Sequence, residues 1–297
     1  MTPNSSDPQR RIRERARPAA RAGVLAALLL AATSLAAPAQ TLPPAQSAPA
    51  AAPDFGQDAT REATWAAIRP DLFPSAPIGE ADGILRIEAP TRAEDAALVP
   101  ITIAIALPKG DPRTLKAVTL VVDENPAPMA GRFGFGEGTT AFTLTVRVRV
   151  NSYSYVRAVA ETSDGALHMT KAFVKAAGGC SAPATKDTAE SIAKLGEMRF
   201  RSFAQSGRPE AQVQIRHPNF SGLQMDEATR GYTPAWFVRE VEVRQGRKLV
   251  FAMEGGISIS EDPTFRFSYT PSAEPVTVRA EDTEGKTFTH TFPGNGS

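Results

Sequence analysis

Cysteine is almost absent from this chain of 297 residues, because Cys180 is its only one. A single thiol cannot form a disulfide within the chain, so the fold is predicted not to depend on such a bond. Histidine is nearly as scarce, with three residues, and none stands at metal-ligand spacing from the cysteine or from another histidine. These counts argue against a metal site built from protein side chains alone.

Long apolar runs are also missing beyond the N-terminal region. There, six arginines precede an apolar run at residues 23–37, and Ala37-Pro38-Ala39 has the small-x-small pattern of a signal-peptidase site. The run is shorter than the roughly 20 residues that span a bilayer. Residues 1–39 are therefore predicted to be an export signal, cleaved near Ala39, rather than a membrane anchor. Arg10-Arg11 leaves both general secretion and twin-arginine export open.

A strong excess of one charge is lacking as well. Removal of residues 1–39 takes away six arginines, Asp7 and Glu14, which lowers the formal net charge from +1 to −3. Nucleic acids and anionic membranes both select a clustered basic face, so neither is an expected partner. Residues 40–57, rich in alanine, proline and glutamine, are predicted to be a disordered leader.

What the remaining chain has in abundance is alternation of apolar and polar residues. Residues 99–107 and 142–150 carry an apolar residue at every second position, as strands with one buried face require. Shorter strands of the same kind are predicted at residues 85–87, 118–122, 155–159, 169–174, 198–203, 211–215, 237–243, 249–253, 265–269, 276–280 and 288–292. The turn signals are Asp82-Gly83, Asp164-Gly165, Gln245-Gly246 and Glu284-Gly285.

These strands divide into two halves of similar size. The first is predicted to be a β-sandwich over residues 58–175, and the second a β-sandwich over residues 196–297. Between them lie an arm and a linker, residues 176–195, with a short helical stretch at 188–195. The predicted fold class is therefore all-β, with two sandwich domains joined by a cysteine-bearing flexible arm.

The arm, residues 176–184, consists of small residues around Cys180. Gly178 and Gly179 precede the cysteine and Pro183 follows it, which argues against a strand or helix there. We expect an exposed thiol on a flexible arm, serving as a nucleophile or as an attachment point. The alternatives are a buried small hydrophobe and a surface thiol without a role.

Self-contained catalysis by the thiol would need a histidine base held against it. His290 alternates with phenylalanines and is predicted to be a core residue, whereas His168 and His217 could each approach Cys180 in the fold. A mobile arm is a poor platform for a fixed dyad.

The glycines at 131, 134, 136 and 138 are interpreted as edge-strand or loop glycines rather than a phosphate loop, because no helix follows them. Asp123-Glu124-Asn125-Pro126 is interpreted as a turn at a strand end.

Two ordered series of short motifs then carry a family resemblance. The first half has Ile87-Glu88-Ala89-Pro90, Ala93-Glu94, Val99-Pro100, residues 122–126, 147–149 and 156–159, and Gly178-Gly179-Cys180. The second half has His217-Pro218, Ser221-Gly222, Asp226, residues 234–237 and 241–246, and a final strand pair through residues 282–292. In this order the chain resembles a fusion of the SoxY and SoxZ sulfur-oxidation carrier proteins, and more closely the quinoprotein dehydrogenase-associated SoxYZ-like carriers.

The resemblance implies immunoglobulin-like sandwiches in both halves, packed against each other, and a periplasmic location. It implies that Cys180 carries a covalently bound, sulfur-containing intermediate, that Gly178 and Gly179 make its arm flexible, and that the protein is not an enzyme and has no cofactor. Partner redox enzymes would receive the cargo, a pyrroloquinoline-quinone-dependent dehydrogenase among them. In SoxY the Gly-Gly-Cys motif ends the chain, whereas here residues 181–184 continue into the second half.

An interpretation of a different class stays open. The chain could be a binding or assembly module for a periplasmic quinoprotein dehydrogenase, in which the thiol is dispensable. The sequence does not identify the cargo, the partner enzymes or the oligomeric state. A dimer linked through Cys180 is compatible with a lone exposed thiol.

Overall fold

The computed structural model describes residues 58–74, 77–81, 83–183, 188–203, 209–226 and 229–294. The predicted export signal and leader lie outside the described residues, as do residues 184–187 of the arm and linker. The export signal and the disordered leader therefore remain predictions. Among the helices of the described part, none combines the length and apolar character that crossing a bilayer requires.

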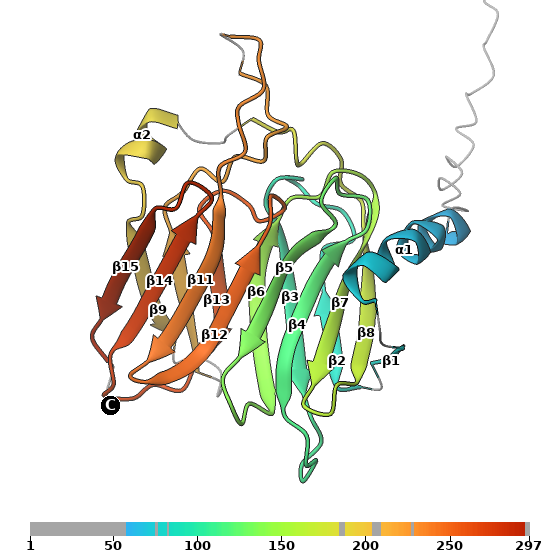
Figure 1. Cartoon of the computed structure of the whole chain (residues 1–297), viewed down its shortest axis with the longest axis vertical. Coiled ribbons are helices and arrows are strands. Elements are labelled where there is room, and N and C mark those ends of the chain that lie inside the picture. The colour runs from blue at the N-terminus through green and yellow to red at the C-terminus, as the bar shows by residue number, and fades with distance from the viewer. Residues whose placement is uncertain are drawn as a thin grey trace, which may run out of the picture. The chain divides into compact units, whose positions relative to one another are not determined.

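Within the described residues the strands form two sheets, one of nine strands and one of six (Figure 1). The larger sheet has the order β1-β8-β7-β4-β5-β12-β11-β14-β15, and the smaller has the order β2-β3-β6-β13-β10-β9. The bounds in the first half are β1 (Ile78–Glu80), β2 (Leu85–Glu88), β3 (Val99–Ala106), β4 (Leu115–Val122), β5 (Met129–Phe135), β6 (Ala141–Val148), β7 (Ser154–Thr162) and β8 (Leu167–Val174). Those in the second half are β9 (Met198–Phe203), β10 (Glu210–Ile215), β11 (Val238–Gln245), β12 (Lys248–Gly255), β13 (Thr264–Ser268), β14 (Val276–Asp282) and β15 (Thr287–Phe292). Two helices, α1 (Asp58–Leu72) and α2 (Thr188–Ala193), complete the elements.

The two longest alternating segments of the sequence became β3 and β6, which pair with each other in the smaller sheet. In both strands every second side chain is buried, and the apolar ones among them fill the space between the sheets. The residues between them, such as Thr143 and Thr145, lie on the outer face of the sheet. The all-β fold class is confirmed.

The two halves have the same strand plan. In the first half β8-β7-β4-β5 faces β2-β3-β6, and in the second half β15-β14-β11-β12 faces β9-β10-β13. The two halves join through their edge strands, because β5 pairs antiparallel with β12 and β6 pairs antiparallel with β13. The predicted packing of the halves is confirmed, and it takes the form of two sheets that run continuously through both halves.

Four phenylalanines form the core at this junction. Phe133 and Phe142 come from the first half, and Phe251 and Phe265 come from the second. Their ring centroids are 5.8–6.5 Å apart in the pairs Phe133–Phe251, Phe133–Phe265, Phe142–Phe251 and Phe251–Phe265. Tilted and edge-on rings at such separations contribute beyond their buried area. One hydrophobic core therefore serves both halves.

Gly131 and Gly134 lie in a central strand of the larger sheet rather than at an edge, whereas Gly136 and Gly138 lie in the loop after that strand, as the sequence suggested. β5 contains Gly131 and Gly134, and β4 and β12 flank it (Figure 1). At Gly136, just after the strand, an added Cβ would lie 2.1 Å from the Leu249 carbonyl oxygen. The edge position was wrong for Gly131 and Gly134 because β5 would be an edge only in an isolated first half. The second half covers that edge.

Helix α1 was not predicted. It lies against the outer face of the larger sheet beside β7 and β8 (Figure 1), where Trp65 packs with Val121 and Val159. Its apolar stripe also includes Ile68 and Leu72, at helical spacing from Trp65. A stripe this narrow is a weak sequence signal among many strand patterns.

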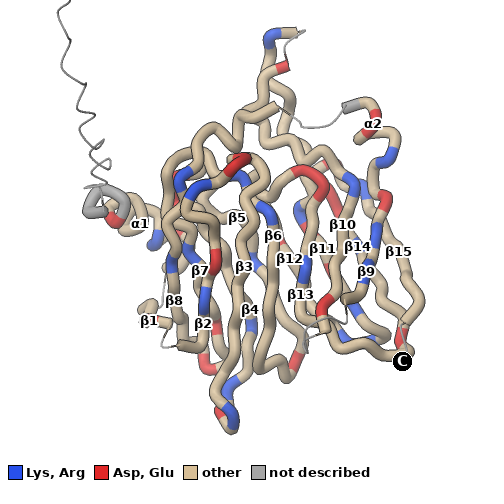
Figure 2. The backbone as a smooth tube through the Cα atoms, turned by 180° about the vertical axis from the view of Figure 1, so that it is seen from behind, with Lys and Arg blue, Asp and Glu red and all other residues tan. Residues whose placement is uncertain are grey.

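Charged residues of both signs are distributed over the strands. Figure 2 shows Lys and Arg positions interspersed with Asp and Glu positions along the backbone. Several of these charges pair between strands: Glu161 on β7 pairs with Lys116 on the neighbouring β4 and with Arg132 on β5, one strand further on. This distribution agrees with the mild net charge of the sequence.

Candidate functional site

Cys180 lies where the arm turns back after β8. The arm runs beside the segment that follows β6, and two backbone hydrogen bonds fix it there. The amide of Gly178 donates to the Asn151 carbonyl (2.8 Å), and the amide of Gly179 donates to the Val150 carbonyl (3.1 Å). The described part of the arm, residues 176–183, is therefore packed structure.

The predicted exposure of the thiol is wrong in this conformation, because Cys180 has an exposed fraction of 0%. Gly179 explains how the thiol is buried. A Cβ there would lie 2.0 Å from the Ala96 carbonyl oxygen and 2.7 Å from that of Val150, so only glycine lets the backbone approach so closely. Gly178 supplies the turn with a φ of +78°. The mobility predicted for the two glycines stays a prediction, since the described conformation has them in place.

A loop of the second half covers the arm. The Ser221 hydroxyl donates to the carbonyl of Cys180, and the Gln224 side-chain amide donates to the carbonyl of Ala182 (3.0 Å). The two loop residues are themselves linked, because the amide of Ser221 donates to Oε1 of Gln224 (3.1 Å). We call Ser221 and Gln224 the latch. The latch holds the cysteine arm of one half through side chains of the other half.

Arg149 places a buried positive charge beside the thiol. It directly follows β6, is 1% exposed, and its Nη2 donates to the Asn219 carbonyl (2.8 Å) in the loop that covers the arm. Its Nε is buried without a hydrogen-bond partner. Burial lowers the pKa of Arg149, and the nearby Cys180, Glu261 and Asp95 oppose that shift.

The thiol itself is neutral in this environment. Burial raises the pKa of Cys180 to about 11, although the charge of Arg149 acts to lower it. At pH 7 this leaves about one molecule in ten thousand as thiolate, the form that reacts with sulfur electrophiles. The closed arm thus protects the thiol.

Asn125 provides a rigid frame under the site. Its side-chain amide donates to the Arg149 carbonyl (2.8 Å) and to the Ser258 hydroxyl (2.9 Å), and its Oδ1 accepts from the Asn151 amide (2.8 Å). Asn125 therefore ties the segment after β6 to the second half. The sequence interpretation of this motif as a turn captured the local backbone but not this crosslink.

The histidines are engaged elsewhere. His217 is fully buried in the loop of the second half, where its Nδ1 accepts from the Asn219 amide (3.0 Å) and its Nε2 lies 3.5 Å from Oδ2 of Asp282. His168 lies on β8 near the Glu80 carbonyl and Arg113. His290 is exposed on the edge strand β15, so its predicted core position is wrong. Burial lowers the pKa of His217 and favours its neutral form.

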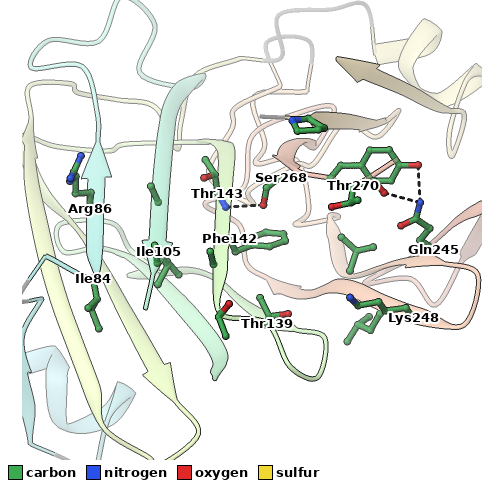
Figure 3. Close-up of a pocket in the computed structure, with 18 of the residues that line it drawn as sticks. Ile84, Arg86, Ile105, Thr139, Phe142, Thr143, Gln245, Lys248, Ser268 and Thr270 are labelled. Carbon is green, nitrogen blue, oxygen red and sulfur yellow. Dashed lines mark hydrogen bonds between the residues drawn. The ribbon is translucent and has the colours of Figure 1, made fainter. Parts of the chain in front are cut away.

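A separate cavity lies at the far end of the junction. It has a volume of about 680 Å³ and is lined by both halves, including Phe142, Thr143, Gln245 and Ser268 (Figure 3). There the pairing of β6 with β13 gives way to a side-chain contact, in which the Thr143 amide donates to the Ser268 hydroxyl (3.1 Å). Thr143 and Arg149 are at opposite ends of β6, roughly 20 Å apart along an extended strand. This cavity is therefore not part of the thiol site.

Sequence reasoning found Cys180 and the two glycines but not the residues around them. Arg149 and Ser221 stood within the recognised short motifs without a role, and Asn219 and Gln224 carried no signal. Three or more His, Cys, Asp or Glu side chains placed to hold a metal ion are not found in the described part of the chain.

Two family models match the chain in succession. Residues 69–180 match the sulfur oxidation protein SoxY, and residues 198–293 match the sulphur oxidation protein SoxZ. Together these ranges cover more than half of the chain. The first match ends on Cys180.

Solved structures are similar to parts of the chain. The sulfur carrier protein SoxY from Chlorobium limicola f thiosulfatophilum is 23% identical, with a TM-score of 0.32, over 41% of this chain and 99% of that one. A superoxide reductase (neelaredoxin) from Ignicoccus hospitalis is 17% identical, with a TM-score of 0.25, over 32% of this chain and 81% of that one. No curated protein matches the chain.

Proposed function

Because the chain belongs to the SoxY and SoxZ families, joined in that order in one polypeptide, we propose that it is a thiol carrier of sulfur oxidation. It holds a covalently bound, sulfur-containing intermediate on Cys180 and presents it to partner redox enzymes in the periplasm. It does not itself catalyse the redox steps. A quinoprotein dehydrogenase is the partner class that the closer resemblance suggests.

One observation carries this proposal. The sole cysteine is the residue at which the SoxY match ends, and it lies on a short arm beneath a loop of the SoxZ half. A cysteine with a purely structural role would need only to be buried. Here side chains of the other half also hold the arm, and these contacts can break without disturbing either sheet. This arrangement suits a group that is stored and then released.

Release requires the arm to leave its place. The latch bonds join side chains to backbone carbonyls, and each such bond contributes about 1 kcal/mol net, so the binding of a partner can supply the free energy that breaks both. In the released arm the thiol is solvated, and its pKa returns toward its ordinary value of 9.0. The closed state then protects the thiol or its cargo between encounters.

The raised pKa of the closed thiol also supports a non-catalytic role. An enzyme nucleophile has its pKa lowered by a positive neighbour or an adjacent base. Here desolvation outweighs the charge of Arg149, and the pKa of Cys180 lies at about 11. The closed arrangement stores a thiol rather than activating it.

Replacement of the cysteine tests the proposal. Cys180→Ser should abolish sulfur oxidation that depends on the protein, because serine forms no persulfide or disulfide-type bond. A matched control is Cys180→Ser combined with Ser181→Cys, which moves the thiol by one residue to an exposed position. This variant should take up thiol reagents and still fail in the pathway. Intact mass of the wild-type protein isolated from its own periplasm should show an adduct on Cys180.

The binding or assembly module is the competing function. If cells with Cys180→Ser oxidise their substrate normally, the carrier proposal is wrong. The sheet surfaces, rather than the thiol, would then recognise the dehydrogenase. Co-purification of the dehydrogenase with both wild-type protein and Cys180→Ser would support that outcome.

A further inference from the structure

The exposed large hydrophobic side chains all lie at one end of the molecule. In the described part of the chain they are Met129, Tyr153, Ile192, Met225 and Tyr232. They belong to the start of β5, the residue before β7, the helix before β9, and the segment between β10 and β11. Because neighbouring strands of these sheets are antiparallel, all four segments lie at the end where β8 leads into the arm (Figure 1). Scattered exposed hydrophobic residues are ordinary, whereas their confinement to one end indicates an interaction surface.

Met225 and Tyr232 are the most exposed of the five, with exposed fractions of 56% and 67%. They lie opposite each other in an antiparallel bridge. The segment that contains them, described at residues 220–226 and 229–236, projects beyond the ends of the sheets between β10 and β11 (Figure 1). We call this segment the hairpin. Its two exposed side chains form an apolar pair on the most prominent feature of this end.

The same hairpin carries the latch. Gln224 directly precedes Met225, and its carbonyl accepts from the amide of Thr233 on the opposite side of the hairpin (2.8 Å). The Gln224 side chain is buried toward the arm, where it binds the Ala182 carbonyl, whereas the next side chain, Met225, is exposed. Successive side chains of an extended segment point to opposite sides. The apolar pair therefore lies on the side of the hairpin that faces away from the arm.

Hydrogen bonds beside the apolar pair hold the hairpin in shape. The amide of Asp226 donates to the Gly231 carbonyl (2.9 Å), and the Asp226 carbonyl accepts from the Arg230 amide (2.8 Å). The Thr229 amide donates to Oδ1 of Asp226 (2.8 Å). A surface that is ordered before binding loses less conformational freedom on association, and methionine and tyrosine are enriched at protein interfaces. The pair is thus a preformed contact for an apolar surface of another protein.

The place of the pair favours a transient partner over a second copy of this chain. A lasting dimer through this end would cover both arms and block the release of the group on Cys180. A redox enzyme that receives this group has to approach the same end, because the thiol lies there. An enzyme that binds the outer side of the hairpin and draws it outward removes Gln224 from Ala182 and Ser221 from Cys180. Docking and release of the arm then occur together.

Resting on the proposed carrier function, we propose that Met225 and Tyr232 bind a partner redox enzyme and that this binding opens the latch. The partner is a protein with an apolar groove beside the opening that admits the thiol. Coupling between two sites is reciprocal. If the bound enzyme favours the open arm, removal of the latch must therefore strengthen the binding of the enzyme to the hairpin.

Photo-cross-linking in the intact cell tests where the enzyme binds. p-Benzoylphenylalanine replaces Tyr232 in the full chain, and in a control chain it replaces Glu137, which is exposed in the loop after β5 at the opposite end. Products are identified by mass spectrometry. We expect a product with a periplasmic redox enzyme from position 232 and no such product from position 137. Removal of the latch by Ser221→Ala with Gln224→Ala should raise the yield at position 232 several-fold.

Substitution of the apolar pair tests its role in the pathway. Met225→Ser with Tyr232→Ser should lower sulfur oxidation by cells about tenfold, as the loss of central interface contacts does. Met225→Leu with Tyr232→Phe keeps the apolar surface and should retain most of the rate. In the isolated double-serine protein, the neutral disulfide dithiodipyridine should label Cys180 at the wild-type rate, because both latch bonds remain.

Three results would overturn the docking site: no product from position 232, a product with a second copy of this chain, or the same enzyme cross-linked from position 137. Faster labelling of Cys180 in the double-serine protein would show that the pair serves only to hold the latch closed. An unchanged cross-link yield without the latch would refute the coupling.

The carrier function fails or stands by a separate result. Cys180→Ser should abolish sulfur oxidation and keep the cross-link at position 232, because docking does not use the thiol. Normal sulfur oxidation with Cys180→Ser would overturn the carrier function, whereas loss of the cross-link in the otherwise wild-type chain would overturn the docking site alone.

Discussion

At the scale of single residues, the chemistry of the protein is concentrated in one buried thiol. Burial raises the pKa of Cys180 from 9.0 to about 11, so the folded state keeps its proton where the unfolded chain loses it. The stabilisation is fully present below pH 9 and is lost as the pH rises toward 11. We predict that the wild-type protein loses on the order of 2 kcal/mol more unfolding free energy than Cys180→Ser between these pH values, measured by urea denaturation. Parallel stability curves for the two proteins would show that the thiol is solvated.

At the scale of elements, the loop of the second half closes over the arm through side-chain contacts that can be removed by substitution without changing the sheets. Removal of the latch by the double substitution Ser221→Ala and Gln224→Ala deletes the donors to the Cys180 and Ala182 carbonyls. At about 1 kcal/mol per bond, the opened arm should become roughly tenfold or more populated. Labelling of the native thiol by a neutral disulfide should accelerate by that factor, whereas the thermal midpoint should change little. Ser181→Ala serves as the control, because it deletes a hydrogen bond within the arm, from the Ser181 hydroxyl to the Gly178 carbonyl, and leaves both bonds to the loop in place. An unchanged labelling rate in the double variant would mean that other contacts hold the arm closed.

At the scale of the whole described chain, the two halves share both sheets and one aromatic core. This predicts that they unfold together as a single cooperative unit. The chain has two tryptophans, Trp65 in the first half and Trp236 in the second. Variants with Trp65→Phe or Trp236→Phe each leave one fluorescent reporter, and both should report the same urea midpoint once the cost of each substitution is subtracted. Phe251→Ala, in the junction core, should lower the unfolding free energy by about 3–5 kcal/mol and move both reporters equally. Two separated transitions would instead identify the halves as independent domains.

Much of the architecture follows from the sequence alone, because strand pairing within a half is encoded by period-two alternation and by local turns. The segments around Ile103 and Val146 became paired strands, and the glycines at 165, 246 and 285 stand at the hairpin turns with positive φ. The motif series also pointed to a SoxY half followed by a SoxZ half, and the family matches bear this out. Local patterns carry this information because each strand and turn depends on residues that are neighbours in sequence.

Only the tertiary structure decided what surrounds the thiol. The small residues around Cys180 predicted exposure, since no local pattern anticipates that Gly179 lets the backbone pack against Ala96 or that Ser221 reaches over from the other half. The same holds for the strand with Gly131, whose edge is covered by a strand more than a hundred residues later. Burial, the pKa of the thiol and the place of Arg149 all arise from contacts between segments distant in sequence. The sequence determined which residue carries the chemistry, and the junction of the two halves determined the state in which that residue is held.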